Sequence, residues 1–216
     1  AGRHVRVAEH EVVGVAVAEA QIVEVGLDAE HHLVDLVVVA DLAAADELER
    51  AVTKLGFKGA MIHGLCNGVF FDDKQFWPIC ERAAKLDVPL YMHPAMPHPA
   101  VIAAYYAEEF PSLLNAGWGF TVETATQGIR LVLSGVFDAH PGLKIILGHL
   151  GETLPFLLWR FDSRAEFHGL KLNKRPSEYI RENIYVTTSG MCSAEPLNCS
   201  LSALGTDRVM FAADFP

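Results

Sequence analysis

Five polar residues in this sequence each close a short apolar run: His63, His93, His149, Ser189 and Asp214. Imidazole and carboxylate groups are the ligands and the acid–base groups of metal-assisted catalysis. If the apolar runs are parallel strands, their carboxyl ends share one edge of a sheet, and these side chains meet there. The residue types and their positions therefore predict a metal site or an acid–base site at that edge.

Not every polar strand end is expected to be functional. A lone histidine more often makes ordinary packing or surface contacts, and we expect this of His63. His93 follows a strongly apolar run and Pro94 fixes the chain just after it, which favours a functional role. Nucleophilic hydrolysis is disfavoured, because no serine or cysteine lies in a G-x-S-x-G-like elbow, and Ser189 lacks that context. Metal-assisted chemistry is the better prediction.

The elements that must position these residues alternate between strands and helices. The expected strands span residues 57–63, 88–92, 144–148, 184–188 and 208–212. The expected helices span residues 46–55, 74–86, 100–110, 118–139, 153–167, 177–182 and 194–204. Continuous apolar strands joined by helices favour a parallel sheet covered by helices. Because no G-x-G-x-x-G motif follows any strand, the predicted fold class is α/β, a TIM-like (β/α)8 barrel, rather than a dinucleotide-binding fold.

Composition narrows the possible partners and the compartment. The 216 residues carry a formal net charge of −10, which argues against nucleic acid and anionic membranes. The sequence contains no apolar run of 18 residues that is free of charges, so no membrane-spanning helix is predicted. The four cysteines show no C-x-x-C spacing, so free thiols and a cytoplasmic location are expected. All aromatic residues and prolines follow Gly56, and we predict an atypical stretch over residues 1–45 before a barrel segment over residues 46–216.

Four segments carry a family resemblance: YMHP (91–94), GHLGETLPFLLWRFDSR (148–164), YVTTSG (185–190) and FAADFP (211–216). They resemble the amidohydrolase-related metal-dependent decarboxylases, which include the γ-resorcylate (2,6-dihydroxybenzoate), aminocarboxymuconate semialdehyde and 5-carboxyvanillate decarboxylases. The resemblance covers about residues 46–216, and G-H-x-G-E-x-L-P followed by W-R is its most specific part. It implies a (β/α)8 barrel, one divalent metal ion (zinc or manganese), an aromatic carboxylate substrate and a homo-oligomer. The implied enzyme is a carboxy-lyase that removes carbon dioxide without oxidation.

The resemblance also assigns roles to residues. His93 and Asp214 are the implied metal ligands, and Asp214 is also an implied catalytic acid. His149 is the implied catalytic histidine, and Glu152, one turn further on, fixes its tautomer. Arg160 is the implied partner of the substrate carboxylate, for which a planar guanidinium suits a bidentate contact.

The sequence departs from the family pattern at both ends. The family carries Glu-x-His or His-x-His on its first strand, which supplies two further ligands. Glu30 and His32 have this spacing, but they lie too close to His93 and lack a family-like neighbourhood, so they are not assigned. The sequence stops at Pro216, directly after the aspartate motif. We therefore expect an incomplete barrel, without the first strands and the C-terminal end, and two alternatives stay open: a hydrolase or hydratase of the same superfamily, and an inactive fragment.

Overall fold

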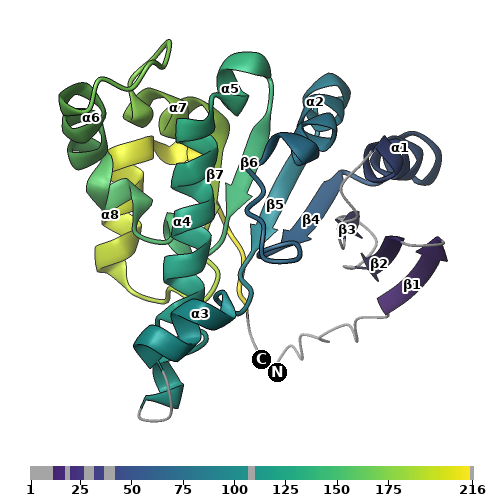
Figure 1. The fold of residues 1–216 in the computed structure, drawn as a ribbon, viewed down its shortest axis with the longest axis horizontal. Coiled ribbons are helices and arrows are strands. Elements are labelled where there is room, and N and C mark those ends of the chain that lie inside the picture. The colour runs from purple at the N-terminus through teal and green to yellow at the C-terminus, as the bar shows by residue number, and fades with distance from the viewer. Residues whose placement is uncertain (1–11, 18–19, 27–31, 37–41, 107–109, 215–216) are drawn as a thin grey trace, which may run out of the picture.

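The computed structural model describes residues 12–17, 20–26, 32–36, 42–106 and 110–214. Eight strands of these ranges form one sheet in which the strands lie in chain order (Figure 1). The strands are β1 (Val12–Val17), β2 (Ala20–Gly26), β3 (His32–Leu36), β4 (Gly59–His63), β5 (Pro89–His93), β6 (Lys144–Leu147), β7 (Ile184–Thr187) and β8 (Val209–Met210).

The sheet has an antiparallel part and a parallel part. Strand β2 pairs antiparallel with both β1 and β3, whereas every neighbouring pair from β3 to β8 is parallel. In the parallel part His63 is the register partner of His93, so both histidines end their strands at the carboxyl edge. His32 begins β3, next to the pairing of Leu33 with Gly59, and therefore lies at the opposite edge.

Helices connect the parallel strands, as the alternating pattern predicts. They are α1 (Leu42–Arg50), α2 (Trp77–Leu86), α3 (Pro99–Val101), α4 (Gly119–Ser134), α5 (Val136–Ala139), α6 (Leu158–Phe167), α7 (Pro176–Asn183) and α8 (Ala194–Leu204). Figure 1 shows them around the parallel strands, with α4 and α8 on one side and α1 and α2 at the other end. No helix in the described ranges has both the length and the apolar character needed to cross a bilayer.

The hydrophobic core lies between the strands and these helices. On β5 and β6 alternate residues are buried, namely Leu90, Met92, Ile145 and Leu147. Successive side chains of a strand point to opposite faces, so the intervening residues, such as Tyr91, belong to the other face of the sheet. That second face is partly polar. The hydroxyl of Tyr91 on β5 lies 3.4 Å from the hydroxyl of Thr187 on β7, with β6 between the two strands.

Several predicted elements are shorter or broken in the structure. The helix expected over 118–139 is divided into α4 and α5 by Gly135, whose φ of +85° ends the first helix. The helix expected over 153–167 starts with a 3₁₀ turn (Leu154–Leu157) before α6, because Thr153 has a φ of +76°. Only Val209–Met210 of the strand expected over 208–212 is paired.

The helix expected over 100–110 is also different. It consists of the short α3 and a π-helical turn (Ile102–Tyr106), and residues 107–109 lie outside the described ranges. The helix expected over 46–55 begins earlier, at Leu42, and ends at Gly56 in a left-handed conformation, as predicted for a glycine at a helix C-terminus.

Candidate functional site

The loop after β6 has an unusual backbone. Its five consecutive residues all have positive φ: His149 (49°), Leu150 (55°), Gly151 (83°), Glu152 (52°) and Thr153 (76°). For residues other than glycine this conformation costs about 1–2 kcal/mol each, because Cβ crowds the following carbonyl. Such strain persists where surrounding packing over-determines it, and it clusters at functional sites. Here the buried side chains of Leu150 and Glu152 anchor the loop.

The loop places His149 between two carboxylates. Its Nδ1 hydrogen-bonds to Oε1 of Glu152, which is fully buried, and its Nε2 lies 3.2 Å from Oδ2 of Asp214. Both carboxylates can only accept from the ring, so the arrangement favours the doubly protonated imidazolium. The hydrogen bond to Glu152 is the largest cause that raises the pKa of His149, against the opposing effect of burial.

His93 has the opposite electrostatic environment. Its Nδ1 lies 2.7 Å from the carbonyl oxygen of Pro94. A carbonyl only accepts, so Nδ1 carries the hydrogen and Nε2 keeps its lone pair. Burial, followed by the neighbouring His63, lowers the pKa of His93. The two rings are 4.7 Å apart between centroids. His93 is therefore held as a neutral imidazole, the form that binds metal ions.

Asp214 is positioned by the segment that follows β8. The hydroxyl of Thr188 donates to the carbonyl of Ala212 (2.8 Å) and accepts from its amide (3.0 Å), which fixes this segment beside the end of β7. The nearby Gly190 must lack a side chain, because a Cβ there would lie 2.9 Å from Cδ2 of His149 and 3.1 Å from Oδ2 of Asp214. The site thus depends on close approach of three loops.

A cavity of about 280 Å³ joins these side chains. It is lined by His93, Pro94, Ala116, Phe120, Thr121, His149, Gly190, Met191 and Asp214. The structure thus brings His93, His149 and Asp214 together at the carboxyl edge of the parallel strands, where the sequence predicts them to meet. Their individual roles stay predictions.

A second, apolar cavity of about 500 Å³ lies on another side of the same histidine. It is lined by His149, Leu150, Thr153, Pro155, Phe156, Met191, Glu195, Pro196, Cys199 and Ser200. His149 and Met191 line both cavities. An apolar space beside a polar one suits a ligand that combines a ring with charged or hydroxyl substituents.

The donors that face the smaller cavity fit a divalent cation in kind but not in number. Neutral His93 and the Asp214 carboxylate are suitable ligands, and protein metal sites use three or four such groups. Within the described ranges no group of three histidine, cysteine, aspartate or glutamate side chains is arranged to hold a metal ion. Glu30 lies outside those ranges, and His32 is at the opposite edge of the sheet.

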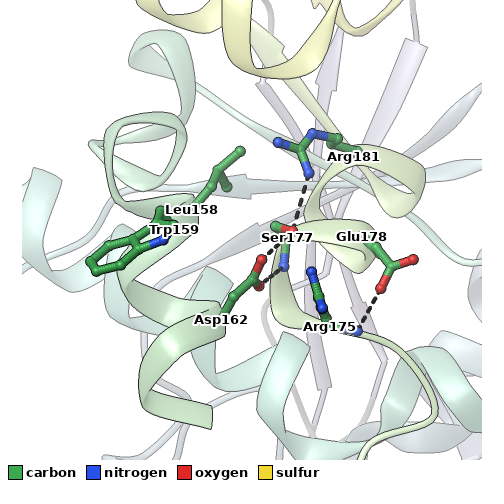
Figure 2. A pocket seen from close by; sticks show the side chains of 7 residues that line it. All are labelled: Leu158, Trp159, Asp162, Arg175, Ser177, Glu178 and Arg181. Carbon is green, nitrogen blue, oxygen red and sulfur yellow. Dashed lines mark hydrogen bonds between the residues drawn. The ribbon is translucent and has the colours of Figure 1, made fainter. Parts of the chain in front are cut away.

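Arg160 does not join the other predicted residues. It is exposed on α6 and is not among the residues that line either cavity beside His149. Its neighbours Leu158 and Trp159 line a separate pocket of about 410 Å³ against α7, where Asp162 faces Ser177 (Figure 2). The role of Arg160 toward a substrate stays a prediction.

Two residues near the site were not assigned a functional role from the sequence. His63, expected to be an ordinary polar residue, packs its ring against His93. Glu123 on α4 is a buried carboxyl group whose pKa is raised to about 7, chiefly by burial. The position of His63 at a strand end was a usable signal, whereas a single glutamate within a helix gave none.

The chain is similar to known proteins over most of its length. A family model described as Amidohydrolase matches residues 2–216. Gamma-resorcylate decarboxylase from Rhodococcus jostii is 40% identical over 187 residues, which cover 81% of this chain and 56% of that protein. 2-Amino-3-carboxymuconate-6-semialdehyde decarboxylase from Dictyostelium discoideum is 27% identical over 179 residues, covering 81% and 47% respectively. The chain spans about half the length of the curated relatives it matches.

A solved structure gives the same picture. The dihydroxybenzoic acid decarboxylase from Polaromonas sp. JS666, with bound manganese and the inhibitor 2-nitroresorcinol, superposes with a TM-score of 0.74 at 40% identity. The match covers 80% of this chain and 55% of that one. The prediction of an α/β fold that corresponds to part of a barrel is confirmed.

Proposed function

Because the chain belongs to the amidohydrolase family, we propose that its site serves the metal-dependent, non-oxidative decarboxylation of a hydroxylated aromatic carboxylic acid. One observation carries the proposal: His149 is held between Glu152 and Asp214 on a cavity that also contains His93. The gamma-resorcylate decarboxylase similarity supports the substrate class. The adjoining apolar cavity offers room for an aromatic ring.

A divalent cation, manganese or zinc, would be held by His93 and Asp214, which supply two of the three or four ligands that protein metal sites use. When bound, it supplies Lewis-acid stabilisation of negative charge on the substrate. The lowered pKa of His93 keeps its Nε2 available to the cation at neutral pH. The manganese in the similar Polaromonas structure supports this cofactor class.

The residues of this chain supply the proton that the reaction needs. Direct loss of carbon dioxide from an aryl carboxylate would leave an aryl carbanion, so protonation of the ring carbon comes first. We infer that the imidazolium of His149, or the carboxyl group of Asp214, delivers that proton; their contact on the cavity supports this inference. The carbon–carbon bond then breaks, carbon dioxide leaves with no change of oxidation state, and the ring becomes aromatic again. The acid regains its proton from solvent.

Glu152 and Arg160 have supporting roles in this proposal. Glu152 accepts from Nδ1 of His149 and so directs the Nε2 proton into the cavity. We keep Arg160 as a proposed partner of the substrate carboxylate on the strength of the family resemblance. Arg160 is exposed on α6 and does not line the cavity that contains His93 and His149.

The proposal is tested by carbon dioxide release from 2,6-dihydroxybenzoate and other ortho-hydroxybenzoates. The chain is loaded with manganese or zinc, and metal content is measured for the wild type, His93→Ala and Asp214→Ala. Release that is lost in both variants and in His149→Ala supports the proposal. Water addition to a lactone or an unsaturated dicarboxylate without carbon dioxide release would instead identify a hydrolase or hydratase. Absence of metal binding and of all turnover would identify an inactive chain.

A further inference from the structure

Ser189 is a polar strand end to which the proposed function gives no role. It lies just after β7, is 4% exposed, and lines neither of the two cavities beside His149. Its Oγ is 2.6 Å from Oγ1 of Thr187, and that Oγ1 is 3.4 Å from the hydroxyl of Tyr91. Three hydroxyl groups, from β5, β7 and the loop after β7, therefore form a chain of polar contacts on one face of the sheet.

This hydroxyl chain ends at the backbone amide of His149. The amide nitrogen donates to Oγ of Ser189 over 3.3 Å. His149 opens a 3₁₀ turn (His149–Gly151), and an amide at the start of a helical turn has no acceptor inside that turn. Ser189 supplies the acceptor, and because a hydroxyl can accept and donate at once, it can also donate its own hydrogen to Thr187. The amide that Ser189 holds belongs to the residue at which the positive-φ loop begins.

Gly148, directly before His149, leaves room for these hydroxyl groups. Its φ of −65° and ψ of −176° are extended values that any residue adopts, so the backbone conformation does not require glycine. A Cβ at this position would lie 3.1 Å from the hydroxyl oxygen of Tyr91 and 3.3 Å from Oγ of Ser189. Both distances are shorter than an ordinary van der Waals contact. The absence of a side chain at Gly148 is therefore explained by the hydroxyl chain that occupies its place.

We propose that Ser189 is a positioning residue for His149: its hydroxyl fixes the backbone amide and thereby keeps the imidazole between its two carboxylate partners. The next residue, Gly190, packs against the same ring, where a Cβ would lie 2.9 Å from Cδ2, so one segment holds both the backbone and the ring of the histidine. The proposal deepens the proposed function, on which its catalytic consequence rests. Ser189 lines no substrate cavity and acts only through His149.

Hydrogen exchange of the His149 amide, followed by NMR on the full chain, tests this contact without any substrate. Ser189→Ala removes the acceptor and should speed exchange of that amide about five- to tenfold relative to the wild type. Ser202→Ala makes the same change at an exposed position of α8 and should leave the rate unchanged. An unchanged rate in Ser189→Ala would overturn the proposal, whether or not the chain is a decarboxylase.

Gly148→Ala perturbs the hydroxyl chain without removing any of its members, and it decides the question if Ser189→Ala fails to fold. The added Cβ should displace the hydroxyls of Tyr91 and Ser189 and so speed exchange of the His149 amide. Tyr91→Phe removes the oxygen that the Cβ approaches most closely, so the double variant should exchange more slowly than Gly148→Ala alone. A wild-type exchange rate in Gly148→Ala, or no recovery in the double variant, would contradict the proposal.

Kinetics on the metal-loaded chain test the positioning role. Ser189→Ala should lower kcat about tenfold, as for other residues that orient a catalytic group, while KM stays within about twofold. The split is expected because Ser189 lines neither cavity. An unchanged kcat, or a rise in KM that accounts for the loss, would contradict the role. A chain without decarboxylase activity would refute the proposed function, and hydrogen exchange would still decide the contact between Ser189 and His149.

Discussion

Two groups of carboxyl side chains in this chain differ in how completely their oxygens are hydrogen-bonded. On the outer side, both oxygens of Asp162 are paired: the amide of Ser177 donates to Oδ1 (2.8 Å) and its hydroxyl donates to Oδ2 (2.7 Å). Nη1 of Arg181 then donates to the same hydroxyl (3.1 Å), as Figure 2 shows. By contrast, Glu152, which pairs with His149, and Glu123 on α4 each retain an unpaired buried oxygen among the described residues.

The backbone conformation also differs between the two regions, since one is a regular helix start and the other is a strained loop. Ser177 lies in the first turn of α7, where an acceptor for its free amide stabilises the start of the helix. The loop from His149 to Thr153 instead runs through five residues with positive φ. A complete network with a relaxed backbone is what stability alone selects, whereas strain and incomplete pairing together indicate a region built for chemistry.

Of the substitutions that test this comparison, we expect the largest loss of activity at His149. His149→Asn should reduce decarboxylation about 10²–10⁴-fold, since it removes the group that transfers a proton. The same change should also lower the free energy of unfolding, because the imidazole is the hydrogen-bond partner of the fully buried Glu152 carboxylate. Turnover and thermal unfolding are measured on the same metal-loaded sample. If the variant retained activity within tenfold of the wild type, His149 would not be the acid, and Asp214 would be the remaining candidate.

A second prediction concerns how the free energy of unfolding depends on pH through Glu123. Its pKa is raised from 4.5 to about 7 in the folded chain, so the folded state binds the proton more tightly than the unfolded state. Between pH 4.5 and 7 the stability conferred by this group is therefore lost as pH rises, by up to about 3 kcal/mol. Urea unfolding of the wild type and Glu123→Gln across pH 5 to 8 measures the difference. Parallel curves for the two proteins would contradict it.

Two glycines with positive φ compare the loop after β6 with a site that has room for a side chain. Gly151 (φ +83°) has no room for a Cβ, which would lie 2.9 Å from Cγ1 of Val186, whereas Gly169 (φ +63°) has nothing within 4 Å. Gly151→Ala should cost about 2–3 kcal/mol from overlap added to backbone strain, and Gly169→Ala about 1 kcal/mol from strain alone. Denaturant unfolding of both variants gives the two costs. Equal values would show that the loop repacks freely.

The smallest expected effect lies in the paired cluster. Ser177→Ala removes one hydroxyl from the network of Asp162 and Arg181 and should cost about 1 kcal/mol. Decarboxylation should not change, because this cluster lines the pocket between α6 and α7 and not the cavity beside His149. Unfolding and turnover are measured in parallel. A loss of activity without a loss of stability would assign this pocket to the reaction.

Local sequence determined a large part of what the structure contains. Short apolar runs that end in His93 and His149 specified the strands and the edge at which polar groups gather, because strand direction follows from the alternation with helices. The pairing of His149 with Glu152 was implied by the family resemblance, and the two side chains are hydrogen-bonded in the structure. The family followed from the motif around them.

Only the tertiary structure decided the remaining features. Glu123 is held through Gln127, one turn further along α4, whose side chain also accepts from the amide of Phe71, a residue far away in the sequence. Arg160, next to the most specific motif, was placed on an exposed face instead. The physical reason is that burial and hydrogen bonding depend on which distant segments meet, and burial is the largest cause that raises the pKa of Glu123. The periodicity of apolar residues along the chain predicts the strands and helices. Packing between these elements decides which carboxyl groups are buried and therefore how readily they ionise.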